Sequence, residues 1–120
     1  MKLINDKELF EFLYDETTED PKPKFFLKKL TGGEVQHIQD IVSTVDDKNI
    51  IHYHGGASNK LMIQYSLVKW EGITGSDNVA VECNNLNKEK LPSEVMKWLI
   101  GKITELNKLS GIQKDEIKNS

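Results

Sequence analysis

The fold that we predict for this chain depends most on residues 58–70, SNKLMIQYSLVKW. Placed on a helix, their apolar side chains cover most of the circumference, and Lys60, Gln64 and Lys69 are the main polar interruptions. A helix that is apolar on nearly every side lies in the centre of a domain or is shared with a partner chain. We therefore predict a central helix that ends before Gly72. Its apolar residues are Leu61, Met62, Ile63, Tyr65, Leu67, Val68 and Trp70.

One further helix is predicted before this segment and one after it. Thr31 and Glu34 form a capping box, and behind them apolar residues recur at three- and four-residue steps up to Val45. The last helix opens at residues 91–94, LPSE, because proline is tolerated in the first turn and an acid there faces the positive end of the helix dipole. Trp98 lies beside its apolar stripe. The stripe consists of Val95, Leu99, Ile103 and Leu106.

The beginning of the chain predicts one more short helix and then a loop. Asn5 and Glu8 form a variant of the capping box ahead of an apolar run, residues 9–14. Residues 15–23 contain two prolines and four acids, so we predict an exposed acidic loop.

Two short apolar segments complete the predicted fold. Residues 25–30, with lysines at their rim, and residues 79–83 are predicted as strands that pair with each other. Residues 1–110 are then a single globular domain, and the polar residues 111–120 are a flexible C-terminal tail. The predicted fold class is α+β: a helix-rich single domain with a small β-sheet or hairpin.

The composition restricts the function classes. The chain has 120 residues and a formal net charge of −3, with 16 basic and 19 acidic residues, and all the basic ones are lysine. A mildly acidic chain without arginine has no electrostatic footprint for nucleic acid. Cys83, the single cysteine, excludes an internal disulfide, and we see neither a signal peptide nor an apolar run long enough to span a membrane. A cytoplasmic protein without a cofactor is the expectation.

Few residues suggest chemistry. On an extended backbone, His52 and His54 share one face, a spacing used by zinc sites on strands, although an ordinary exposed loop explains them better. Cys83 is interpreted as a small buried residue rather than a nucleophile, because the neighbouring Glu82 raises a thiol pKa. The two tryptophans, Trp70 and Trp98, suit either the core or a contact with a partner protein.

The order of three segments resembles small tail-assembly proteins of long-tailed bacteriophages. These are residues 68–78 (VKWEGITGSDN), residues 91–99 (LPSEVMKWL), and residues 25–34 (FFLKKLTGGE). The family turn usually carries an Asp-Gly pair, where this chain has Ser76-Asp77-Asn78.

The resemblance implies a non-enzymatic chaperone that self-associates and coats the helical tape-measure protein in the host cytoplasm before the tail tube polymerises. Two alternatives stay open: another small phage structural or tail-completion protein, and a small metal-dependent enzyme that uses His52 and His54.

Overall fold

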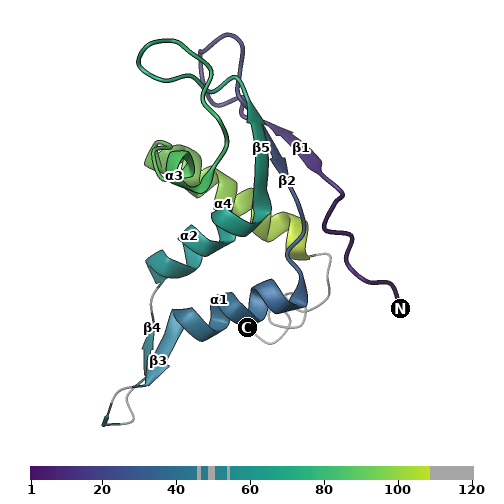
Figure 1. The fold of residues 1–120 in the computed structure, drawn as a ribbon, viewed down its shortest axis with the longest axis vertical. Helices are drawn as coiled ribbons and strands as arrows, with labels where there is room; N and C mark the ends of the chain where they lie inside the picture. The colour runs from purple at the N-terminus through teal and green to yellow at the C-terminus, as the bar shows by residue number, and fades with distance from the viewer. Residues whose placement is uncertain (46, 49–50, 54, 109–120) are drawn as a thin grey trace.

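The computed structural model describes residues 1–45, 47–48, 51–53 and 55–108. The chain forms helices and two small sheets, and this α+β arrangement confirms the predicted fold class (Figure 1). None of the helices in this part of the chain combines the length and hydropathy needed to cross a bilayer. The elements are β1 (Phe10–Leu13), β2 (Lys24–Leu27), α1 (Gly32–Val42), β3 (Ser43–Val45), β4 (Ile51–Tyr53), α2 (Gly55–Ser66), β5 (Leu67–Glu71), α3 (Asn85–Lys88) and α4 (Ser93–Lys108).

The larger sheet has three antiparallel strands in the order β1-β2-β5. Phe25 in the central strand stands opposite Phe12 on one side and Trp70 on the other. Side chains of a strand point alternately to the two faces, so Phe25 and Leu27 are buried on the inner face, with 0% exposure each. The smaller sheet pairs β3 with β4 at the opposite end of the molecule (Figure 1).

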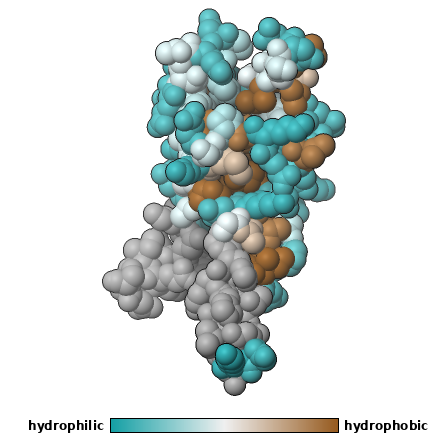
Figure 2. Space-filling model, turned by 90° about the vertical axis from the view of Figure 1, so that its left-hand side faces the viewer, coloured by the Kyte–Doolittle hydropathy of each residue, from teal (hydrophilic) through white to brown (hydrophobic). Residues whose placement is uncertain are grey.

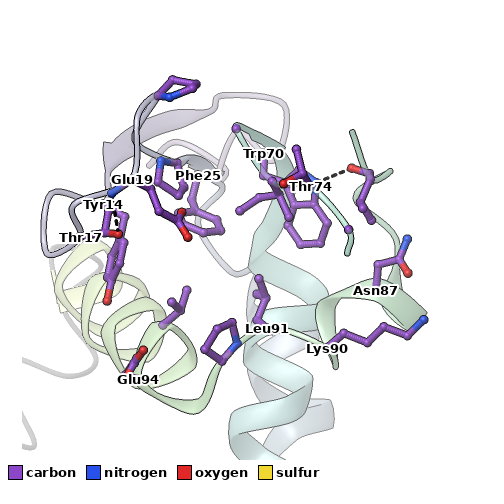
Figure 3. A pocket seen from close by; sticks show the side chains of 18 of the residues that line it. Tyr14, Thr17, Glu19, Phe25, Trp70, Thr74, Asn87, Lys90, Leu91 and Glu94 are labelled. Carbon is purple, nitrogen blue, oxygen red and sulfur yellow. Dashed lines mark hydrogen bonds between the residues drawn. The ribbon is translucent and has the colours of Figure 1, made fainter. Parts of the chain in front are cut away.

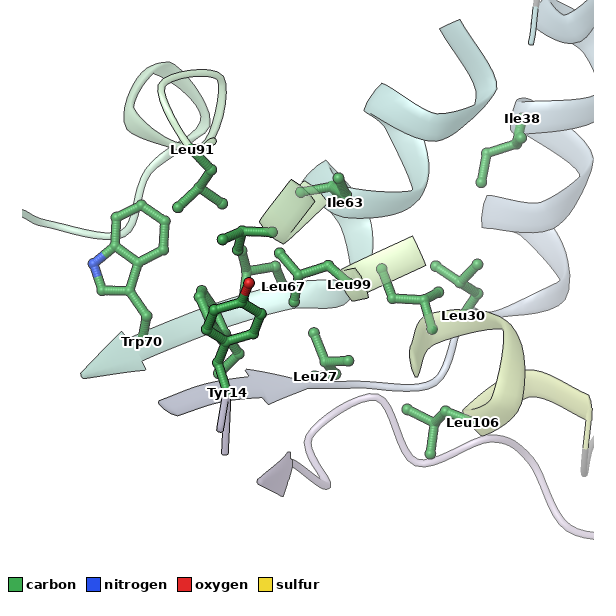
Figure 4. Close-up of a cluster of buried hydrophobic side chains, with 13 residues drawn as sticks. Tyr14, Leu27, Leu30, Ile38, Ile63, Leu67, Trp70, Leu91, Leu99 and Leu106 are labelled. Carbon is green, nitrogen blue, oxygen red and sulfur yellow. The ribbon is translucent and has the colours of Figure 1, made fainter. Parts of the chain in front are cut away.

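Helices α2 and α4 cover the inner face of the larger sheet (Figure 4). Leu99 and Ile103 of α4 are fully buried, and Ile63 of α2 is 2% exposed. Helix α1 packs against α2 through Ile38, which belongs to the same apolar cluster. This single cluster of buried side chains therefore holds the sheet and three helices together.

Two buried polar side chains join the ends of elements. The Ser66 hydroxyl donates to the carbonyl of Lys28 at 2.7 Å, and the Lys28 N–H donates to the Ser66 carbonyl at 2.9 Å. The Asn107 side chain accepts from the Leu30 N–H at 3.0 Å and donates to the Ile103 carbonyl at 2.7 Å. A buried donor or acceptor without a partner is costly, so these bonds fix where α2 ends and how α4 meets the segment after β2.

The helices predicted from capping signals are present. The Thr31 hydroxyl accepts from the Glu34 N–H at 3.2 Å, and the Glu34 carboxylate accepts from the Thr31 N–H at 2.9 Å, which is a complete capping box at the start of α1. Helix α4 begins at Ser93, within the predicted opening segment 91–94, although Pro92 precedes the first turn instead of lying in it. The predicted strand 25–30 is also confirmed, as β2, although it is shorter.

Four predictions are wrong. Residues 9–14 contain strand β1 rather than a helix, because partly buried Phe10 and Phe12 alternate with exposed Glu11 and Leu13, which is a period of two. Residues 58–70 are not one helix. Helix α2 ends at Ser66, and the remaining apolar residues form β5, whose pairing with β2 outweighs the helical pattern.

Residues 79–83 are not the strand that pairs with β2, since β5 takes that place. They form one side of a hairpin in which Thr74 and Ala80 make an isolated antiparallel bridge. The helix predicted up to Val45 ends at Val42, and the short helix α3 was not predicted. The tail at residues 111–120 lies outside the described residues.

Candidate functional site

A groove of about 980 Å³ opens at one end of the larger sheet (Figure 3). Its walls are the loop after β1, the hairpin after β5, and the segment from α3 to the start of α4. The two loops extend beyond the same end of the sheet (Figure 1), so segments far apart in sequence meet there.

The floor of the groove is apolar and continuous with the core. Phe25, Trp70, Leu91 and Val95 line it and are each at most 9% exposed. Because these side chains are packed from below, the floor has a fixed shape. Aromatic and aliphatic side chains in such a depression bind apolar groups of a ligand or a partner.

Hydrogen bonds hold the hairpin wall in place. The Trp70 indole N–H donates to the Val81 carbonyl at 2.7 Å. Within the hairpin, the Gly75 N–H donates to the Val79 carbonyl at 3.0 Å, and Asn78 occupies the left-handed region with φ of 61°. An asparagine tolerates this conformation better than most residues, which suits the tight turn.

The two loops touch at Gly72. This glycine has φ of 78°, and a Cβ there would lie 3.3 Å from both the Lys22 carbonyl oxygen and the Pro23 Cα. A glycine is therefore needed both for the backbone conformation and for the close approach. Directly after β1, the Tyr14 N–H donates to the Pro23 carbonyl at 2.9 Å, which closes the loop of residues 15–22.

Acidic side chains line one side of the groove. Glu16, Glu19 and Asp20 come from the loop after β1, and Glu94 comes from the first turn of α4. Lys90 lies at the opposite side from Glu94 (Figure 3). The groove therefore has a negative side and a smaller positive side above a shared apolar floor.

Tyr14 lies on the negative side. It is 7% exposed, and its hydroxyl points towards the first turn of α4, where Glu94 lies (Figure 3). Burial raises the pKa of this phenol, and the charges of Glu94, Glu16 and Glu19 raise it further. Within the described part of the chain, no group forms a hydrogen bond with the Tyr14 hydroxyl.

The two tryptophans that were predicted as core or partner-binding residues occupy different positions relative to the groove. Trp70 is in the floor of the groove. Trp98 is half-buried on α4, where its ring lies 5.1 Å from the Tyr14 ring in an edge contact and 5.8 Å from the Phe25 ring. Trp98 thus packs against two residues that line the groove, without lining it itself.

His52, one of the two predicted metal ligands, is not among the residues that line the groove. His52 is in β4 opposite Thr44, and His54 lies outside the described residues. The third histidine, His37 on α1, is hydrogen-bonded to the Tyr65 hydroxyl on α2. Among the described residues, no three His, Cys, Asp or Glu side chains gather to hold a metal ion. The two-histidine metal site stays a prediction.

Cys83, which follows the hairpin in the chain, is partly buried. Burial raises the pKa of its thiol, Glu82 raises it further, and Lys88 partly opposes them. The predicted direction of this shift is confirmed, although burial is the larger cause. Lys88 is itself 7% exposed, and its ammonium donates to the Gln64 carbonyl at 3.2 Å. Since a raised pKa disfavours the thiolate, this cysteine is a poor nucleophile.

Comparison with known proteins adds nothing to this geometry. No protein-family model, curated protein or solved structure matches the chain. The functional argument therefore depends on the groove.

Proposed function

We propose that the protein is a non-enzymatic binding protein, a chaperone of bacteriophage tail assembly that holds segments of the helical tape-measure protein. The observation that carries this proposal is the groove, whose apolar floor is fixed by the core and whose volume is about 980 Å³. A depression of this kind binds a few side chains of a partner segment.

The position of the resembling segments supports the same proposal. Residues 70–78, within the first segment, supply the floor residue Trp70 and much of the hairpin wall. Residues 91–95, within the second, supply the opposite wall. Segments that resemble tail-assembly proteins therefore converge on one groove, although the family pattern has a helix where β5 stands.

Exposed apolar side chains also suit a protein partner. Figure 2 shows the face towards which α3 and the hairpin project, where apolar side chains alternate with hydrophilic ones. Leu86 on α3, for example, is 66% exposed. Side chains of this kind around a groove add contact area when a partner docks.

Self-association is part of the proposal. Strand β1 is the outer strand of its sheet, and Met1, Leu3 and Ile4 lie exposed in the segment before it. An outer strand presents unpaired backbone groups that a second copy can bind. Light scattering over a range of concentrations tests this part, and a strictly monomeric protein contradicts it.

Co-expression with the tape-measure protein, followed by a pull-down, tests client binding. Thr74→Trp places a bulky ring at an exposed position that lines the groove, and we expect it to remove the client. Val79→Trp is the matched control, because Val79 is exposed on the same hairpin but does not line the groove. Retention of the client by both variants contradicts the proposed use of the groove.

The alternative of another small phage structural or tail-completion protein predicts binding to a tail protein other than the tape measure, and the same pull-down with each tail protein separates the two. The alternative of a metal-dependent enzyme predicts stoichiometric zinc that is lost in a His52→Ala, His54→Ala variant. Metal analysis of the purified protein tests it.

A further inference from the structure

The negative side of the groove contains an unused polar group. The Tyr14 hydroxyl is attached to a residue that is 7% exposed, and none of the described residues hydrogen-bonds to it. A hydroxyl on a buried side chain that has no protein partner and faces a groove can form a hydrogen bond with a ligand that enters the groove.

The surroundings of this hydroxyl indicate what the ligand carries. Three carboxylates, from Glu94, Glu16 and Glu19, line the groove together with Tyr14. Burial raises the pKa of Tyr14 most, and these three charges raise it further. They come from two elements on different sides of the tyrosine, the loop after β1 and the first turn of α4. A cationic N–H donor placed there meets a neutral oxygen acceptor and opposite charges together, and such charge-assisted hydrogen bonds are the strong ones.

The floor indicates what carries the cation. Phe25, Trp70 and Leu91 extend the groove away from Tyr14 as an apolar surface, and Lys90 lies at its far side (Figure 3). A small free cation would contact the carboxylates and leave the apolar floor uncovered. A peptide that places a basic side chain beside apolar ones uses both the acids and the floor.

We propose that the groove recognises a peptide segment of the partner in which a lysine or arginine stands next to apolar residues. The basic side chain donates to the Tyr14 hydroxyl and faces Glu16, Glu19 and Glu94, and an apolar neighbour lies on the floor. This inference rests on the proposed binding function and names the class of segment that the groove selects.

Two capped peptides test the proposal on the wild-type chain, without any variant. One is Ala-Leu-Lys-Leu-Ala, and the other has norleucine in place of lysine, which keeps the length and apolar character but removes the charge. We expect the lysine peptide to bind at least about tenfold more tightly at low salt, with the preference shrinking as salt rises. The indole N–H signals of Trp70 and Trp98 in nuclear magnetic resonance spectra report where the peptide binds, and that of Trp70 should shift more.

Variants then assign the selectivity to the named groups. Tyr14→Phe keeps the ring that packs on Trp98 and should weaken the lysine peptide severalfold without affecting the norleucine peptide. A triple variant, Glu16→Gln, Glu19→Gln, Glu94→Gln, should abolish the preference. Its matched control removes the same charge from three exposed acids outside the groove, Glu8→Gln, Glu82→Gln, Glu105→Gln, and should keep it.

Three results overturn the inference. They are equal binding of the two peptides, no binding of either at about 2 mM, and binding of spermidine at the acids as tight as that of the lysine peptide. The pull-down distinguishes this failure from failure of the proposed function. If the client is retained while the peptides show no preference for lysine, the inference alone is wrong. If lysine is preferred but no tape-measure protein is retained, the proposed function is wrong.

Discussion

Replacement of Trp98 by alanine separates its two interpretations, core residue and partner-binding residue. In the structure its ring makes an edge contact with Tyr14 at 5.1 Å and a tilted contact with Phe25 at 5.8 Å, and the Lys102 ammonium lies 5.7 Å from its centre. All three contacts are within the chain. We therefore expect Trp98→Ala to lower the free energy of unfolding whether or not a partner is present.

The magnitude follows from these contacts. Changing a fully buried tryptophan to alanine lowers the free energy of unfolding by about 3–5 kcal/mol. For the half-buried Trp98, the lost burial should account for about 2 kcal/mol. The aromatic contact adds about 0.5–1.5 kcal/mol. The partly exposed Lys102 adds about 0.5 kcal/mol. The expected total is about 3 kcal/mol, a large part of the stability of a domain of this size.

Urea unfolding followed by circular dichroism measures this loss. Trp98→Phe keeps a ring against Tyr14 and should lose about 1 kcal/mol. Lys97→Ala, at the exposed neighbouring position on α4, should change stability by no more than about 0.5 kcal/mol. If Trp98→Ala loses under about 1 kcal/mol while client binding disappears, Trp98 is a partner-binding residue and the argument from its internal contacts is wrong.

Three further predictions concern the groove and its attachment to the core. Gly72→Ala should lower the free energy of unfolding by about 1–3 kcal/mol, because position 72 has a positive φ and its backbone lies close to Pro23. Gly101→Ala, in open space within α4, should gain about 0.5–1 kcal/mol, and thermal unfolding compares the two. Asn107→Ala should lose about 2–4 kcal/mol in urea, since it removes a buried side chain and leaves the Leu30 N–H without its acceptor. Because the pKa of Tyr14 is raised in the folded state, stability from this group is present below its ordinary value of 10.0 and is lost as the pH rises through the folded pKa. Unfolding measured from about pH 8 to pH 11 should therefore show a steeper alkaline loss for the wild type than for Tyr14→Phe, and equal slopes contradict it.

Local signals in the sequence predicted the elements that local interactions build. The capping box of Thr31 and Glu34 and the proline before Ser93 place the starts of α1 and α4, because a helix terminus is satisfied by residues within one turn. The strand at 25–30 was also found, from its short apolar run between lysines.

The errors occur where a distant segment decides the structure. Residues 67–71 have an apolar pattern that continues α2, but they pair with β2, which lies about forty residues earlier in the chain. The buried Ser66 hydroxyl marks the change, and only its bond to the Lys28 carbonyl shows why the helix stops there. Periodicity within one window contains no information about such pairing.

The candidate site was only partly visible for the same reason. Trp70 was predicted as either a core residue or a partner-binding residue; it is buried in the core and also lines the groove. Glu16 and Glu19, interpreted as part of an exposed loop, line the groove because the closed loop returns towards α4. The signal that was available is that both acids follow within five residues of Tyr14, where the apolar run ends.

The attachments of the loops determine how the groove should behave when it binds. Both walls are tied to the sheet: the Trp70 indole N–H bonds to the Val81 carbonyl, Gly72 packs against Pro23, and the Tyr14 N–H bonds to the Pro23 carbonyl. These contacts exist before any partner arrives, so the entropy of ordering the walls is lost during folding rather than during binding. A flexible partner segment then bears most of the entropic cost of ordering, and its affinity should rise when it is held in its bound conformation, for example by cyclisation. A groove tied at three points should therefore discriminate between segments by charge and shape, with little movement of its own backbone.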